Sequence, residues 1–326
     1  MTVSLERLIP SLPTPIDQQR VIVRRADGLH LETRKLAPPG AGEALVKIEA
    51  AALCRTDLAA AEGAIHVDAG RVLGHEAAGV VLATGPDKPI AVNTRVAINP
   101  LTTCATCRAC RAGEAQNCLR PRFLGLDRDG CFADYVVLPA AQLVACPGAG
   151  DPLRRAYFEP LAAALGVFDA PLQRDSRILL VGRNRIIGLT NTLLQRAGYR
   201  NLECRAAPDL AGLPTNRFDI AVESGLDADL AAQLVRVLRP GGCLVLKTRH
   251  NAPVAVDVAA VVAKSLTLKA CRYGSFARAA ELTADLSFPL EPLLGPAFSL
   301  QRFESAFAAA SGGEKRKVFI DPTLPE

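Results

Sequence analysis

"SRILLVGRNRIIGLTNTLLQRAGYRNLECRA", residues 176–206, is the stretch that decides the fold of this chain. Residues 178–181 form a short continuous apolar run, which is typical of a parallel strand buried on both faces. A segment with helical spacing follows from residue 189, and residues 201–206 again favour a strand. The stretch therefore predicts a strand–helix–strand unit.

The same alternation continues towards the C-terminus. FDIAVESG, residues 218–225, and GCLVLKT, residues 242–248, are strand-like, and residues 227–240 between them have a helical pattern. Strands that alternate with helices in this way predict a doubly wound parallel sheet. We therefore expect an α/β chain with a doubly wound parallel sheet in the part after about residue 150.

The part before residue 150 has a different character. Short segments such as EALVKIEAAAL, residues 43–53, alternate apolar and polar side chains and end at glycine or proline, as strands of a β-rich domain do. Residues 1–20 read as a loosely packed, proline-bearing arm. Residues 291–326 hold a further helix and strand.

Bulk composition limits the classes of function. The chain has 326 residues, enough for two domains, and its net charge of +5 comes from dispersed arginines, so no nucleic-acid partner is expected. It contains no apolar run of about 18 residues, which argues against a membrane span. The N-terminus lacks an apolar signal core, so we expect a cytoplasmic protein with reduced thiols.

NPLTTCATCRACRAGEAQNC, residues 99–118, holds four of the ten cysteines. Cys104, Cys107, Cys110 and Cys118 are spaced Cys-x2-Cys-x2-Cys-x7-Cys, and four thiolates in a tight loop match tetrahedral zinc. Iron–sulfur runs begin similarly but reach a Cys-Pro pair after about three residues; buried thiols gathered by coincidence are the remaining alternative. We expect a closed structural zinc site, which would fold the loop and leave no position open for substrate.

A second set of possible metal ligands is scattered along the chain. Cys54, His75, Glu76 and Glu159 supply thiolate, imidazole and carboxylate, and three protein ligands plus water define a catalytic zinc site. Each residue is weak support when taken singly. His75 could be a hydrogen-bonded core histidine, and Cys54 could be a small buried apolar residue.

Several segments, in order and at the right separations, resemble the zinc-dependent medium-chain dehydrogenase/reductase family, and within it the polyol and threonine dehydrogenases. The resemblance covers nearly the whole chain from about residue 20. It rests on CRTD (54–57), GHEAAGVV (74–81), the four-cysteine lobe, GCFADYVVLP (130–139) and EPLAAAL (159–165).

The resemblance implies a role for each matched residue. Cys54 and His75 would bind the catalytic zinc, with Glu159 and Glu76 filling or exchanging at the remaining protein position. Asp57 would orient His75, as metal-bound histidines usually require. Thr56 would bridge the substrate oxygen to a proton relay. Zinc would polarise the carbonyl or stabilise an alkoxide, and a nicotinamide cofactor would carry the hydride.

The nucleotide site departs from the family pattern. Where the family has G-x-G-x-x-G, this chain has GRNRIIG, from Gly182 to Gly188. Asn184 or Arg185 stands in place of the central glycine, and the loop has room for one extra residue. A side chain there should obstruct the usual pyrophosphate pose. Either Arg183 and Arg185 hold the phosphates directly, or the site is degraded and binds dinucleotide poorly.

Three further positions differ from the resembled family. The second strand ends at Arg205 and Ala206, without the acid that holds the ribose of NAD, which favours NADP unless Arg205 is only a surface residue. Ala59 and Gly166 occupy places where the family often has histidine. The proton would need another route, and His66 is either a substitute or a plain surface histidine.

We therefore expect a GroES-like catalytic domain at residues 1–150, a Rossmann domain at 151–290, and a return to the catalytic domain at 291–326. The predicted function is zinc- and NAD(P)-dependent oxidation of a secondary alcohol, polyol-like in character, or reduction of the matching ketone. The alternative is a zinc-binding relative that has lost dinucleotide-dependent redox activity. The resemblance also implies two zinc ions per chain and a homodimer or homotetramer.

Overall fold

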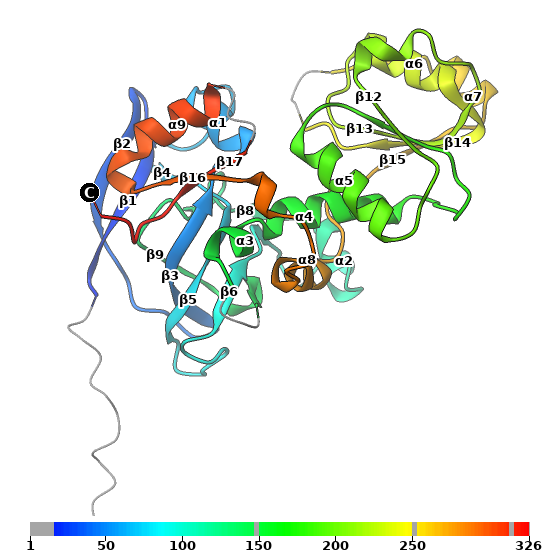
Figure 1. The fold of residues 1–326 in the computed structure, drawn as a ribbon. Coiled ribbons are helices and arrows are strands. Elements are labelled where there is room, and N and C mark those ends of the chain that lie inside the picture. Colours follow the sequence, from blue (N-terminus) through cyan, green and yellow to red (C-terminus); the bar gives the residue numbers. More distant parts are fainter. Residues whose placement is uncertain (1–15, 147–149, 250–252, 313–315, 326) are drawn as a thin grey trace, which may run out of the picture.

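The structure, a computed structural model, describes residues 16–146, 150–249, 253–312 and 316–325. Two lobes lie side by side, one rich in β-strands and one a sheet flanked by helices (Figure 1). The predicted combination of a GroES-like β-rich domain and a Rossmann sheet is confirmed. The expected N-terminal arm lies almost wholly outside the described residues.

The β-rich lobe is built mainly from antiparallel strands. The order β10–β6–β5–β3–β17–β16 defines its larger sheet, and β9 also pairs with β3. The strands of this sheet are β3 (Glu43–Ala52), β5 (Glu76–Thr84), β6 (Arg95–Ile98), β9 (Tyr135–Pro139), β10 (Leu143–Ala145), β16 (Leu294–Phe298) and β17 (Lys317–Ile320). β17 pairs antiparallel with β3, so the C-terminal segment completes a sheet begun near the N-terminus.

A smaller antiparallel sheet covers one side of this lobe. Its order is β2–β1–β4, from the strands β1 (Gln18–Arg25), β2 (Gly28–Lys35) and β4 (Arg71–Val72). α1 (Arg55–Ala61) and α9 (Phe303–Ser311) lie beside each other at the end of the lobe (Figure 1). The cysteine-bearing segment projects from the lobe and contains β7 (Leu101–Thr102), α2 (Arg108–Arg111), η1 (Ala115–Asn117) and β8 (Arg122–Phe123).

The second lobe contains the predicted parallel sheet. Within the described residues it has five strands in the order β12–β11–β13–β14–β15. They are β11 (Ile178–Val181), β12 (Leu202–Arg205), β13 (Phe218–Glu223), β14 (Leu238–Leu246) and β15 (Thr267–Ala270), accompanied by α5 (Arg185–Arg196), α6 (Ala228–Val237) and α7 (Val258–Ala263). β11 is buried along its whole length, as its apolar run predicts.

This strand order is shorter than that of a six-stranded dinucleotide-binding sheet. In the six-stranded order 3-2-1-4-5-6, a further strand lies outside the second one. Here residues 206–217, all of them described, contain only the short helix η4 (Ala207–Leu210) between β12 and β13. β12 is consequently an edge strand, and Cys204 and Arg205 at its end are exposed.

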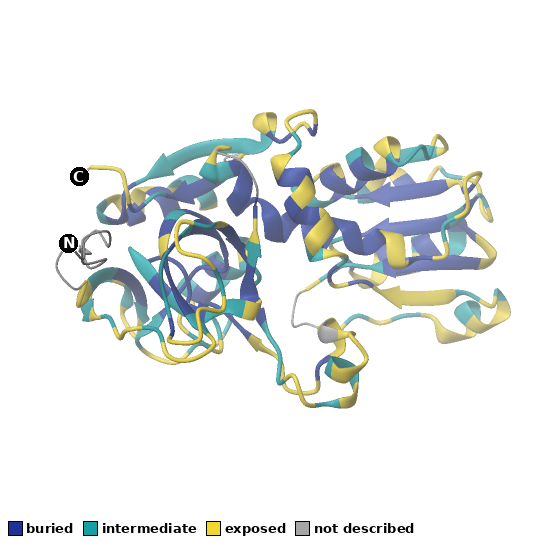
Figure 2. Cartoon of the chain, turned by 90° about the horizontal axis from the view of Figure 1, so that it is seen from below, coloured by how far each residue is buried: buried dark blue, intermediate teal, exposed yellow. Residues whose placement is uncertain are grey.

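A buried apolar cluster joins the two lobes. It combines residues of β3, β5 and β6 with α3 (Pro152–Ala156), α4 (Phe158–Leu165), α5 and α8 (Phe276–Ala284). Figure 2 shows dark, buried ribbon where the two lobes meet, and α4 is buried along its whole length. None of the helices in the described part combines the length and the apolar character that crossing a bilayer requires.

Candidate metal and cofactor sites

The four clustered cysteines converge in the projecting segment. Their sulfurs lie within 4.8 Å of one another, with 3.4 Å between Cys107 and Cys110 and 3.6 Å between Cys104 and Cys118. Ligands at the usual zinc–sulfur bond length of about 2.3 Å in a tetrahedron would be about 3.8 Å apart. This donor set therefore fits zinc.

Backbone groups in the lobe favour the thiolate form of Cys104, whereas burial and the neighbouring thiols Cys107 and Cys118 raise the pKa of Cys110 to about 11. Backbone N–H groups of Thr106 and Cys107 lower the pKa of Cys104 to about 5. The backbone N–H groups of Cys104 and Arg120 donate to the Cys118 sulfur at 3.3 and 3.4 Å. Because zinc binds thiolate and not thiol, this environment prepares the lobe for metal.

A second cluster brings together three of the four scattered ligands. The Cys54 sulfur, a ring nitrogen of His75 and a carboxylate oxygen of Glu76 lie within 4.8 Å of one another. Cys54 is the N-cap residue of α1, and His75 and Glu76 sit at the start of β5. His75 and Glu76 are buried, whereas Cys54 is partly accessible. The set of sulfur, nitrogen and oxygen donors suits a zinc ion.

Asp57 fixes this cluster from behind. Its Oδ1 lies 3.2 Å from Nδ1 of His75, and its Oδ2 accepts a 2.8 Å hydrogen bond from the backbone N–H of Cys54. Burial alone would lower the pKa of His75, but Asp57 and Cys54 outweigh it and raise this pKa. A carboxylate of this kind orients the imidazole and fixes which ring nitrogen faces a metal.

The backbone before His75 needs a glycine. Gly74 has φ of +95°, and a Cβ there would lie 2.6 Å from the Phe132 ring. The Gly74 carbonyl accepts a hydrogen bond from the backbone N–H of Cys131. Glycine is therefore needed at position 74 because the segment before β5 packs closely against the segment of Cys131 and Phe132. This close packing fixes the position of His75.

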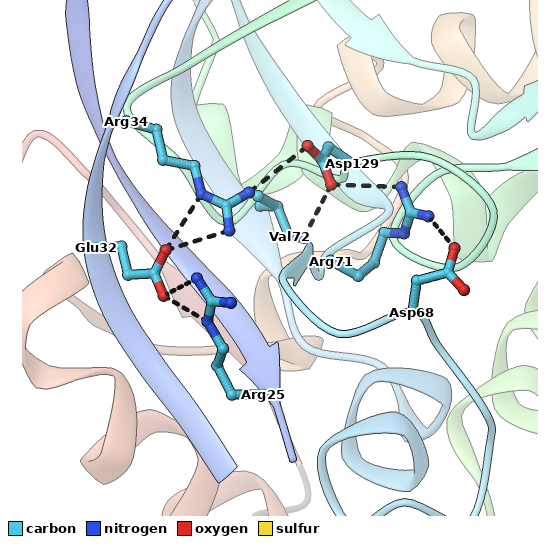
Figure 3. A network of polar contacts seen from close by, with 7 residues as sticks. All are labelled: Arg25, Glu32, Arg34, Asp68, Arg71, Val72 and Asp129. Carbon is cyan, nitrogen blue, oxygen red and sulfur yellow. Dashed lines mark hydrogen bonds and ion pairs between the residues drawn. The ribbon is translucent and has the colours of Figure 1, made fainter. Parts of the chain in front are cut away.

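An ion-pair network supports the segment that leads into Gly74 (Figure 3). Asp129 accepts a hydrogen bond from the backbone N–H of Val72 at 3.1 Å and lies 3.5 Å from Arg71. The network continues through Asp68 on one side and through Arg34, Glu32 and Arg25 on the other. Exposed ion pairs contribute at most about 1 kcal/mol each to folding stability. The chief effect of the network is therefore to hold the backbone before Gly74 in place.

Glu76 has a partner that the sequence did not reveal. The Lys317 ammonium lies 2.8 Å from Oε1 and 2.5 Å from Oε2 of Glu76, and both side chains are buried. Burial raises the pKa of Glu76, and the lysine opposes this shift. Lys317 is the first residue of β17, far from Glu76 in sequence, so only the fold brings the pair together.

Glu159 lies outside this three-residue cluster. It is the second residue of the buried helix α4. Its Oε1 accepts a 2.5 Å hydrogen bond from the Tyr273 hydroxyl and lies 3.6 Å from Nη1 of Arg249. Thr56 is close to the cluster, with its hydroxyl oxygen 3.9 Å from the Cys54 sulfur. His66 is exposed on the loop after α1.

The glycine-bearing loop is short. Gly182 directly follows β11, and Asn184 caps α5 by accepting a hydrogen bond from the backbone N–H of Ile187. Asn184 also donates to the Ser224 hydroxyl at 2.6 Å. Asn184 therefore stands where the central glycine of the motif would be. Because α5 begins directly at Arg185, the loop itself holds no extra residue.

The third glycine position is also filled. Three residues after Asn184 stands Ile187, which is buried in the sheet–helix core. Gly188 is exposed one residue later, and a Cβ added there would meet open space. Gly188 therefore does not provide the close helix–strand contact of a G-x-G-x-x-G loop.

The three arginines proposed for the cofactor lie near this loop. Arg183 is highly exposed and lies 3.8 Å from Asp209, while Arg185 donates to the backbone carbonyl of Arg316. The Arg205 carbonyl accepts a hydrogen bond from the Gly182 N–H, so the ends of β12 and β11 meet. The Arg205 guanidinium pairs with Glu203 at 2.9 Å. Arg205 thus already has an acidic partner, which the sequence did not predict.

Further cations follow the last two strands of the parallel sheet. Lys247 and Arg249 come after β14, and Arg272 comes after β15. The Lys247 ammonium lies 3.3 Å from where a Cβ of Gly166 would be, and burial lowers the pKa of Lys247 to about 8. The sequence signal that could have found these residues is their place at the carboxyl ends of parallel strands, where α/β sheets bind ligands.

Comparisons with known proteins agree with this architecture. The alcohol dehydrogenase GroES-like domain matches residues 40–148. L-threonine 3-dehydrogenase of Deinococcus deserti is 27% identical over 90% of this chain and 96% of the relative. The corresponding enzyme of Streptomyces avermitilis is 28% identical over 87% and 93% of the two chains.

Solved structures are similar over nearly the whole chain. A protein of Sinorhizobium meliloti 1021 described as a zinc-binding dehydrogenase, bound to NADP, has a TM-score of 0.85 at 23% identity, covering 94% of this chain and 99% of that one. RspB of Escherichia coli CFT073, complexed with NADH, has a TM-score of 0.84 at 21% identity over 94% and 99%. The chain therefore carries an alcohol dehydrogenase GroES-like domain, and over nearly its whole length it is similar to threonine and zinc-binding dehydrogenases, which supports an oxidoreductase of the zinc-dependent medium-chain dehydrogenase type.

Proposed function

We propose that this protein transfers a hydride between NADP(H) and a secondary alcohol, polyol-like in character, or the matching ketone, at a zinc ion held by Cys54 and His75. The observation that carries the proposal is the compact Cys54–His75–Glu76 donor set, oriented by the buried carboxylate of Asp57. A bound zinc would supply Lewis acidity, and a bound nicotinamide would supply or accept the hydride.

The surrounding residues have separate tasks in this proposal. Asp57 holds the His75 ring and the Cys54 backbone in place. Lys317 restrains Glu76, which would complete or exchange at the zinc shell. Thr56 places a hydroxyl beside the cluster, where it would accept and pass on the alcohol proton. Glu159 would serve as an alternative ligand only if it left Tyr273 and Arg249.

The cofactor would lie across the carboxyl ends of the parallel strands. Arg183 and Arg185 flank the start of α5, where a pyrophosphate binds in sheets of this kind. Arg205 at the end of β12 would meet a 2′-phosphate and favour NADP over NAD. Its pairing with Glu203 weakens that preference, because the phosphate would compete with a carboxylate.

One observation favours a second function. Asn184 and Ile187 fill both places where the motif needs glycine to admit a pyrophosphate and to pack helix against strand. A relative with a complete metal site and an obstructed nucleotide site would act as a binding protein or catalyse a step without hydride transfer.

We further propose a second, structural zinc in the four-cysteine lobe, and assembly into a dimer or tetramer through β15. This edge strand is exposed, with Leu268 on it and Val258 and Val262 on the adjacent α7. Unpaired strand edges of this type readily pair with another copy. We also propose a cytoplasmic location, which the reduced thiols that both proposed metal sites require would support.

Metal analysis and cofactor fluorescence together test the proposal. We expect about two zinc equivalents per chain, and quenching or enhancement of NADPH fluorescence on titration with protein. Full zinc occupancy with no binding of NADPH or NADH would reject the hydride-transfer function and favour the second function. A single equivalent that is lost on Cys104→Ser would show that Cys54 and His75 hold no zinc.

A further inference from the structure

A pair of arginines lies beside the proposed catalytic zinc site. Arg272 is stacked over the Phe123 ring at 5.5 Å, and that ring is 5.0 Å from the ring of His75. Arg249 lies 3.6 Å from Glu159. Both guanidinium groups also cover the Tyr273 ring, at 4.9 Å for Arg249 and 5.6 Å for Arg272.

The two arginines are held in place by their surroundings. Arg249 donates a 3.1 Å hydrogen bond to the backbone carbonyl of Arg272, which ties the segment after β14 to the segment after β15. Stacking on Phe123 and Tyr273 fixes the plane of the Arg272 side chain without using its N–H groups. Because these side chains are already ordered, they would lose little conformational entropy when a ligand binds.

The local charges do not balance. Glu159 faces Arg249, whereas Arg272 contacts two aromatic rings and pairs with no carboxylate in the described part of the chain. Both side chains remain substantially exposed, so their donors are accessible from the site.

We propose that Arg272 and Arg249 form an anion-recognition subsite, so that the alcohol or ketone handled at the Cys54–His75 site carries a carboxylate or phosphate group. This inference rests on the proposed function and adds the class of substrate to it. Guanidinium groups bind both anions through paired N–H donors, so the geometry favours the shared anionic chemistry over a neutral polyol. Stacked on Phe123 beside His75, Arg272 would orient the substrate's reacting carbon towards the metal.

Equilibrium binding of matched probe pairs tests the subsite. Zinc-loaded full-length protein would be titrated calorimetrically with acetoacetate against methyl acetoacetate, and with dihydroxyacetone phosphate against dihydroxyacetone. Oxidised NADP would be present, so that no ketone is consumed. We expect the anionic member of at least one pair to bind about ten- to a hundredfold more tightly than the neutral one. The pair that shows the preference distinguishes carboxylate from phosphate.

Arg272→Gln should reduce this preference to less than about threefold, because the remaining Arg249 is already engaged by Glu159. Arg302→Gln is the matched control, since Arg302 is likewise exposed and stacked on a phenylalanine, Phe298, away from this cluster. It should keep the full preference. Equal binding within both pairs by the parent protein, or a preference that survives Arg272→Gln, would overturn the subsite.

Zinc content and NADPH fluorescence measured on the same samples separate the two proposals. Normal metal and cofactor binding without an anion preference would reject the subsite alone. An anion preference that depends on Arg272, in protein that binds no cofactor, would support the subsite and reject hydride transfer.

Discussion

The two lobes of this molecule differ in how completely they keep their ligand sites. In the β-rich lobe, the four cysteines converge, and Cys54, His75 and Glu76 come together with their orienting carboxylate in place. In the parallel-sheet lobe, Asn184 and Ile187 replace two motif glycines, and no strand lies outside β12 among the described residues. Metal sites need a few donors at fixed distances, whereas a dinucleotide needs an extended, unobstructed surface. Single substitutions therefore obstruct a dinucleotide site more easily than they remove a metal site.

The largest expected effect concerns the four-cysteine lobe. Cys107→Ser should remove one zinc equivalent and destabilise the protein severely, because structural zinc contributes about 10–16 kcal/mol of apparent binding energy in zinc-finger peptides. Metal analysis and thermal unfolding measure both effects. Cys204→Ser, at an exposed cysteine outside both clusters, is the control and should behave like the parent. Retention of two zinc equivalents by Cys107→Ser would refute the assignment.

Next in size is the buried pair behind the catalytic cluster. Lys317→Met leaves the Glu76 carboxylate buried without its cation, which should lower the free energy of unfolding by about 3–5 kcal/mol. Chemical denaturation measures this loss. Adding Glu76→Gln to the same chain should restore much of it, while Lys35→Met at the exposed end of β2 should have little effect. No recovery in the double variant would show that the pair is not the cause.

A smaller effect is expected at the carboxylate that orients the histidine. Asp57→Asn keeps the side-chain shape but removes the charge beside His75, so affinity for the catalytic zinc should fall about 10- to 100-fold. Competition with a chromogenic chelator resolves this ion from the one in the cysteine lobe. Asp87→Asn, at an exposed carboxylate that likewise accepts from a backbone N–H, should leave both affinities unchanged. Equal weakening of both zinc ions would contradict separate sites.

The smallest effect bears on the obstructed loop. Asn184→Gly restores the central glycine and removes one helix cap, which costs only a few tenths of a kcal/mol. NADPH and NADH should then both bind severalfold more tightly, since the backbone can approach the pyrophosphate. Asp227→Gly removes the equivalent cap of α6 and should change stability alone. Unchanged cofactor affinity in Asn184→Gly would show that Asn184 is no obstacle.

Local sequence patterns predicted much of this fold. The apolar run at residues 178–181 identified a buried parallel strand, and the cysteine spacing identified a lobe whose ligands are neighbours in sequence. Residues 206–217 are too few to hold a further helix and strand, so the open β12 edge could have been inferred from their number.

Other features depend on contacts between distant segments. Lys317 meets Glu76 only because β17 joins the sheet of β3 and β5, and nothing local marks it as buried. The same holds for Arg272, whose position over Phe123 requires the two lobes to be in contact. Likewise, Glu159 was expected among the zinc ligands, but its contacts with Tyr273 and Arg249 emerge only in the folded chain.

Fluorescence titration of zinc-loaded protein with NADPH and NADH tests the central claim most directly, because the reduced nicotinamide reports its own binding. We predict saturable binding of both, with NADPH bound up to about tenfold more tightly, and loss of that preference in Arg205→Ala. Failure of either nucleotide to bind, in protein that carries two zinc equivalents, would contradict it and leave a metal-bearing relative without hydride transfer.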